Sequence, residues 1–124
     1  MSKRRTITLT DRSPIQIIES RWPVIASASG DNYQGLDASH PVSCGCCDRW
    51  FIRVRRHRDG RVIVYGIYAV GEFSGSGYAG PGKAGQLLAA GDDVVAAVRR
   101  VVRTLGLPTR TITDCVARLP VERI

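Results

Sequence analysis

The chain has 124 residues, an apolar fraction of 44% and a formal net charge of +7. This length predicts one domain, residues 1–124, which is large enough to bury a core without disulfides or a structural metal. No apolar run approaches the roughly 20 residues of a transmembrane helix, and no hydrophobic segment follows the basic N-terminal residues as it does in a secretory signal. We therefore expect a cytoplasmic protein with no membrane partner.

The N-terminal third predicts three short strands. Residues Thr6–Thr10 alternate between polar and apolar, and Ile15–Ser20 is rich in β-branched side chains, both of which favour strands. A further strand is expected at Pro23–Ser29, where small residues predominate. Small side chains in a strand indicate that another element, such as a helix, approaches the sheet closely.

The segment from Trp50 to Ala69, WFIRVRRHRDGRVIVYGIYA, predicts a β-hairpin that turns at Asp59-Gly60. Asp-Gly between apolar strands is typical of a two-residue loop. Such a loop pairs Val54 with Tyr65 and assigns the side chains to two faces. One face would carry Trp50, Ile52, Val54, Ile63, Tyr65 and Ile67, and the other Phe51, Arg53, Arg55, His57, Val62, Val64 and Tyr68.

Helices are predicted near the C-terminus. Asp92 is the expected N-cap of a helix whose apolar residues from Val94 to Leu105 share one face, and Gly106 is expected to end it. A shorter helix should follow through about Leu119, and residues 84–90 suit either a short helix or a strand. Strands first and helices last predict an α+β fold, in which an antiparallel sheet of about four strands carries the C-terminal helices on one face.

Two irregular segments, 30–48 and 71–83, contain the candidate metal and phosphate motifs. Zinc binds four nitrogen or sulfur ligands, and the first segment offers His40, Cys44, Cys46 and Cys47. No second Cys or His pair accompanies them, so we favour no metal and no cofactor, with zinc as an alternative. The second segment has a G-x4-G-K spacing, but alanine follows in place of the Ser or Thr that a P-loop needs.

The arginine-rich face of the hairpin is the candidate partner-binding site. Arginine binds phosphate and carboxylate groups in a bidentate manner and stacks on flat rings. An acidic protein or nucleoprotein complex, nucleic acid, or merely solvent are the three alternatives for this face. The candidate residues are Arg49, Phe51, Arg53, Arg55, His57, Arg61 and Tyr68, together with Phe73 and Tyr78 of the second irregular segment.

The sequence contains no recognisable catalytic set, because its two histidines and scattered carboxylates form no triad or acid pair. We therefore expect a non-enzymatic binding protein. A homodimer is a further possibility, since the strand Tyr65–Ala69 is a candidate sheet edge that would pair with another chain.

The segments RWPVIASAS and RVRRHRDGRVIVYGIY, and the helix followed by LGLP, resemble a group of small uncharacterised proteins of proteobacterial mobile genetic elements. The resemblance implies an accessory role on such an element, including inhibition of a host defence complex. It brings no site residues with it. Direct nucleic-acid binding and a zinc-stabilised small domain are the alternatives to this function.

Overall fold

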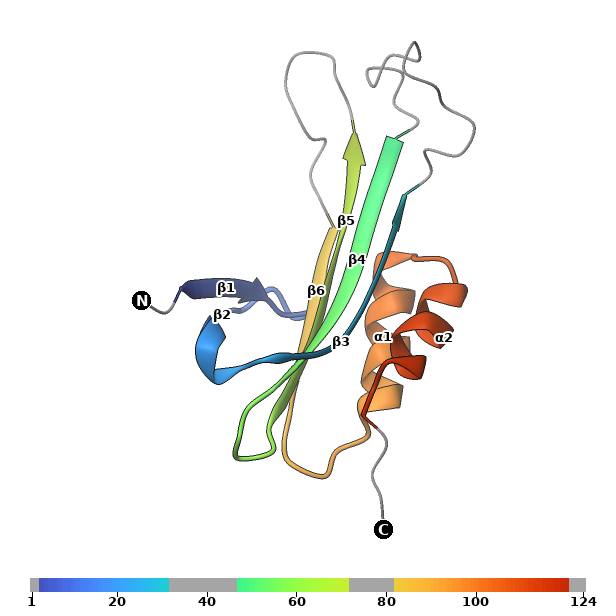
Figure 1. The fold of residues 1–124 in the computed structure, drawn as a ribbon. Helices are drawn as coiled ribbons and strands as arrows, with labels where there is room; N and C mark the ends of the chain where they lie inside the picture. Colours follow the sequence, from blue (N-terminus) through green and yellow to red (C-terminus); the bar gives the residue numbers. More distant parts are fainter. Residues whose placement is uncertain (1–2, 32–46, 72–81, 121–124) are drawn as a thin grey trace.

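A computed structural model describes residues 3–31, 47–71 and 82–120 of the chain (Figure 1). Its strands are β1 (Arg4–Thr8), β2 (Pro14–Ile18), β3 (Val24–Asp31), β4 (Cys47–Arg56), β5 (Val62–Gly71) and β6 (Gly82–Leu88). A 3₁₀ turn, η1 (Glu19–Arg21), precedes β3, and the helices are α1 (Val94–Leu105) and α2 (Arg110–Ala117). The predicted α+β class, with the helices on one face of an antiparallel sheet, is confirmed.

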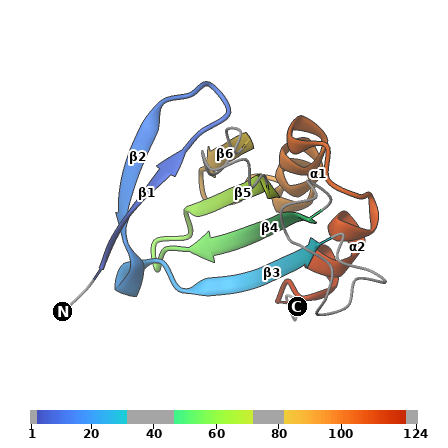
Figure 2. The ribbon, with the colours of Figure 1, turned by 90° about the horizontal axis from the view of Figure 1, so that it is seen from above.

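The described residues form a four-stranded antiparallel sheet in the order β3-β4-β5-β6 and a separate β1–β2 hairpin. Figure 2 shows the two helices on one side of the sheet and the hairpin on the other. Each side therefore has its own apolar cluster. The helix side buries Ile52, Val54, Val62, Val64, Val98, Val101 and Cys115 among others, and the hairpin side buries Ile7, Ile17, Trp22, Ile63 and Tyr65.

The predicted strands exist, with shifted ends. The first lies at Arg4–Thr8 rather than Thr6–Thr10, and the last residues of the segment Ile15–Ser20 belong to η1. Residues 84–90, for which helix and strand were both open, lie mainly in β6. The small residues of β3 let a helix approach the sheet closely, as predicted. Ala26 and Ala28 are buried in the cluster that contains residues of α2.

The predicted register of the β4–β5 hairpin is wrong by one residue. Val54 pairs with Val64, and Arg53 pairs with Tyr65. The amide of Gly60 donates to the carbonyl of His57, Gly60 has a φ of +96°, and the amide of His57 donates to the carbonyl of Arg61. These bonds define a three-residue loop in which a glycine in the left-handed region closes the turn.

A shift of one residue moves the side chains of β5 to opposite faces relative to β4. Ile63, Tyr65 and Ile67 therefore lie on the face that carries Phe51 and Arg53. Tyr68, predicted on that arginine face, lies on the helix side, where its ring stacks with Trp50 at a centroid distance of 6.0 Å. The other residues moved to the helix side are Val62 and Val64.

The strand predicted as an edge is internal. Residues 65–69 belong to β5, which lies between β4 and β6. Among the described residues the edges of the larger sheet are β3 and β6, and the amide of Thr10 donates to the carbonyl of Gly85 on β6. Residues 65–69 are therefore not the exposed sheet edge through which a homodimer was predicted to form.

Both ends of α1 are fixed by local chemistry. The N-cap is Asp93 rather than the expected Asp92, and its carboxylate accepts a hydrogen bond from the amide of Ala96. Asp92 instead accepts from the amide of Ala89 and so braces the preceding turn. Gly106 ends the helix in the left-handed conformation, as predicted.

Candidate binding surface

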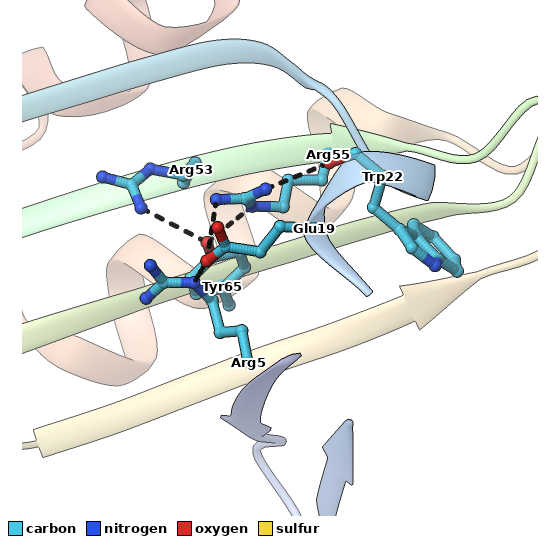
Figure 3. Close-up of polar contacts among 6 residues, drawn as sticks. All are labelled: Arg5, Glu19, Trp22, Arg53, Arg55 and Tyr65. Atoms are coloured by element: carbon cyan, nitrogen blue, oxygen red, sulfur yellow. Dashed lines mark hydrogen bonds and ion pairs between the residues drawn. The ribbon is translucent and has the colours of Figure 1, made fainter. Parts of the chain in front are cut away.

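Arg55, a predicted partner-binding residue, is buried beneath η1 and is 6% exposed. Its guanidinium donates to the hydroxyl of Tyr65 at 2.9 Å and to the backbone carbonyl of Trp22 at 3.1 Å. The carboxylate of Glu19 lies 3.9 Å away (Figure 3). Arg55 therefore ties η1 to the sheet and cannot reach a partner without unfolding this region.

Glu19 is the carboxylate at the centre of this network. It accepts a hydrogen bond from Nε of Arg5 (Figure 3), and this bond is the main reason why its pKa lies below the usual value. Burial opposes this effect and is the second-largest influence on the pKa, while the charges of Arg5, Arg55 and Lys3 each lower the pKa by a smaller amount. Arg5 and Arg55 thus share one internal acid, which offsets one of their two positive charges.

At the turn end of the hairpin, Arg61 is also paired within the chain. Arg61 pairs with Asp59 at 2.7 Å, and its guanidinium lies 5.2 Å from the ring centre of Trp22. His57 contacts the same indole at a centroid distance of 5.0 Å, and its Nδ1 accepts a hydrogen bond from the amide of Asp59. The predicted site residues His57 and Arg61 therefore hold the turn against Trp22.

Within the described residues, the part of the predicted face that stays open lies beyond the β1–β2 hairpin. Arg49, Phe51 and Arg53 occupy alternate positions of β4, and Ile67 lies opposite Phe51 on β5. We call these four residues the Arg53 patch. With neighbouring residues of β3 and β4 they line a hollow of about 450 Å³.

The contacts of Arg53 decide which chemistry this patch offers. The guanidinium lies 4.8 Å from the centre of the Phe51 ring and 3.5 Å from the hydroxyl of Tyr65. The rings of Phe51 and Tyr65 also form a T-shaped pair with a centroid distance of 6.1 Å. The Phe51 ring is therefore engaged by Arg53 and by Tyr65, and the patch presents cations at the rim of a small apolar floor.

Several candidate residues lie outside the described part of the chain. These are His40, Cys44, Cys46, Phe73 and Tyr78, and the side chain of Cys47. Among the residues that the structure does describe, no three potential metal ligands cluster. Cys115 is buried in the helix-side core, and burial raises the pKa of its thiol to about 11, so that it is protonated at neutral pH.

A second basic surface is formed by Arg21, Arg56 and Arg58. The sequence places Arg56 and Arg58 near the arginine-rich face of the hairpin, but it does not show that they form a separate groove with Arg21. These side chains border one groove at the end of β4. Arg21 is 35 positions from Arg56 in the chain, so no local sequence motif indicates that these two side chains line the same groove. Only the folding of η1 against the end of β4 brings the three together.

In comparisons with known proteins, no protein-family model, curated protein or solved structure matches the chain. Within residues 3–31, 47–71 and 82–120, no helix is long and apolar enough to cross a bilayer.

Proposed function

We propose that this chain is a small non-enzymatic binding protein that engages an acidic surface of a partner protein or nucleoprotein complex through the Arg53 patch. The observation that carries the proposal is the placement of Arg49 and Arg53 around a hollow of about 450 Å³ on the open part of the sheet. A net charge of +7 would steer an acidic partner towards this surface.

The contrast with the arginines that are paired within the chain supports this assignment. Arg55 and Arg61 have acceptors within the chain, whereas among the described residues Arg53 has only a long contact to the Tyr65 hydroxyl and a stacking contact to Phe51. Its guanidinium therefore retains donors for an incoming carboxylate. A bidentate pair formed there would be shielded by the rings beneath it.

Direct nucleic-acid binding at the same patch is the weaker alternative. Single-stranded binding surfaces stack bases on open aromatic faces. Here Arg53 lies over the Phe51 ring, and Tyr68, the second ring expected on this face, lies on the helix side. The patch suits an acidic side chain better than a base.

A role as a mobile-element accessory protein, such as an inhibitor of a host defence complex, fits a binder of this kind. An inhibitor acts by occupying a surface and needs no catalytic group. Localisation in the cytoplasm, where such complexes operate, is part of the same proposal.

The proposal is tested by affinity capture from host lysate with the Arg53→Glu variant. We expect wild-type protein to retain a defined partner after nuclease treatment and Arg53→Glu to lose it. Arg99→Glu on the exposed side of α1 is the matched control, because it makes the same change of charge away from the patch. Capture by Arg53→Glu equal to that by Arg99→Glu contradicts the proposal, provided that circular dichroism shows both variants folded.

A further inference from the structure

A groove of about 780 Å³ lies where η1, the start of β3 and the end of β4 meet. We call it the arginine groove. Its lining residues are Ser20, Arg21, Pro23, Ile25, Arg56, His57 and Arg58. This set contains three arginines and a histidine and no carboxylate, and Pro23 and Ile25 supply an apolar wall.

The backbone holds these side chains in place. The amide of Arg56 donates to the carbonyl of Pro23 at 3.1 Å and so fixes the end of β4 beside the start of β3. Trp22 is buried between His57 and Arg61, which anchors η1 and with it Arg21. Arg58 lies in the three-residue loop that Gly60 closes. The three arginines therefore lie on segments that backbone hydrogen bonds and the contacts of Trp22 hold in place.

The three guanidinium groups differ from most others in this region. Arg21, Arg56 and Arg58 are exposed, and within the described residues their side chains have no hydrogen bond or ion pair. Three described carboxylates of this region accept hydrogen bonds from other groups: Glu19 from Arg5, Asp59 from Arg61, and Asp92, which borders an adjoining hollow with Arg56, from the amide of Ala89. Three like charges around one concavity whose lining residues include no carboxylate leave a local excess of positive potential.

We infer that the arginine groove is a binding site for phosphate groups of a nucleotide or of nucleic acid. Arginine forks match phosphate oxygens in a bidentate manner. The linked phosphates of a nucleotide, or successive singly charged phosphates of a nucleic-acid backbone, neutralise more of the cluster than one carboxylate does. The volume falls within the roughly 300 to 1,000 Å³ of small-molecule sites. The wall formed by Pro23 and Ile25 gives a sugar or base an apolar surface to contact.

The groove is independent of the Arg53 patch, and the inference goes beyond the proposed function. Arg53 and Arg56 are three positions apart on β4, so their side chains point to opposite faces of the sheet. Variants at one site should leave the other intact. A nucleoprotein partner would be able to use both.

The test is fluorescence anisotropy with three probes: a labelled single-stranded oligonucleotide, a labelled duplex and a fluorescent ATP analogue. If three phosphates of nucleic acid are neutralised, the logarithm of the affinity should fall with the logarithm of salt with a slope of about −2 to −3. Raising salt from about 50 to 200 mM would then weaken binding by roughly 20- to 40-fold. Binding of the ATP analogue alone assigns the site to nucleotides, and binding of either oligonucleotide assigns it to nucleic acid.

The variant that removes the site is Arg56→Gln with Arg58→Gln. Loss of two of three phosphate contacts should reduce the slope to about −1 and lower affinity at low salt by at least about tenfold. The matched control, Arg99→Gln with Arg103→Gln, removes the same charge from the exposed side of α1 and should bind almost as wild type. Arg21→Gln provides an independent variant on η1.

Three results would overturn the inference. The first is that no phosphate-bearing probe binds at low salt, and the second is that the groove and control variants lose equal affinity. The third is competition by polyglutamate as effective as that by an oligonucleotide of equal charge, which would assign the groove to acidic protein. Binding of the probes by Arg53→Glu separates this outcome from failure of the proposed function, because that variant removes only the patch.

Discussion

Replacing Arg55 by methionine tests whether this arginine is structural rather than a partner contact. Methionine retains the length and apolar stem of the side chain but removes every donor. The hydroxyl of Tyr65 and the carbonyl of Trp22 would lose donors that now lie at 2.9 and 3.1 Å in a buried setting. Each lost hydrogen bond from a charged group corresponds to about 1.5 to 3 kcal/mol.

Part of this loss is recovered, because Tyr65 retains its long contact from Arg53 and the buried charge itself is removed. We therefore expect Arg55→Met to lower the free energy of unfolding by about 3 kcal/mol. The assay is urea denaturation followed by circular dichroism, since urea, unlike guanidinium, does not screen charges. Arg58→Met, at an exposed position three residues on, is the control and should change stability by less than about 0.5 kcal/mol.

A second substitution tests the contact between Arg55 and Tyr65 directly. Tyr65→Phe removes the hydroxyl that Arg55 contacts, so the double variant should lose less than the sum of the single losses, with a coupling of about 1 kcal/mol or more. A loss below about 0.5 kcal/mol for Arg55→Met would refute the buried-network interpretation. Strictly additive single effects would show that Arg55 and Tyr65 do not interact.

Three further predictions follow from local contacts, each measured by urea denaturation. Asp93→Ala removes the N-cap bond to the amide of Ala96 and should lower stability by about 1 kcal/mol, and an unchanged midpoint would exclude this capping role. Gly60→Ala places a Cβ on a residue in the left-handed region, 2.9 Å from the Cβ of Ala90. We expect the free energy of unfolding to fall by about 1 to 2 kcal/mol. An unchanged free energy of unfolding would contradict the three-residue loop. The pKa of Glu19 is lowered from 4.5, chiefly by the hydrogen bond from Arg5, so its contribution to stability is present above that pH and is lost as pH falls below it. Glu19→Gln should therefore flatten the acid side of the stability profile, and profiles that run parallel from neutral pH to about pH 2 would show that the pair is not stabilising.

The elements that the sequence predicts best are those whose signals are local. Gly106 ends α1 because the left-handed C-terminal position favours glycine. The alanines of β3 mark close approach of a helix because no larger side chain would leave room. These features depend on a few neighbouring residues, so the sequence shows them directly.

The register of the hairpin could not be read in the same way. An Asp-Gly pair is compatible with a two-residue loop and with the longer loop that the structure contains. Polar alternation would have distinguished them, but β5 has none, because Ile63 and Val64 are both fully buried on opposite faces. A strand covered on both sides has an almost continuous apolar sequence, which gives no indication of register.

The elements that pack on the second face of the sheet also explain why the arginines of β4 have different roles. The β1–β2 hairpin and η1 fold over the middle of the sheet, so Arg55 is enclosed while Arg53 stays on the open part. Arg56 follows Arg55 directly but points the other way, where it borders the groove. Adjacent guanidinium groups thus serve the fold, the Arg53 patch and the arginine groove. The number of arginines in a sequence cluster is therefore the largest number that can contact a partner. The contacts that each arginine makes within the chain decide how many of them remain available.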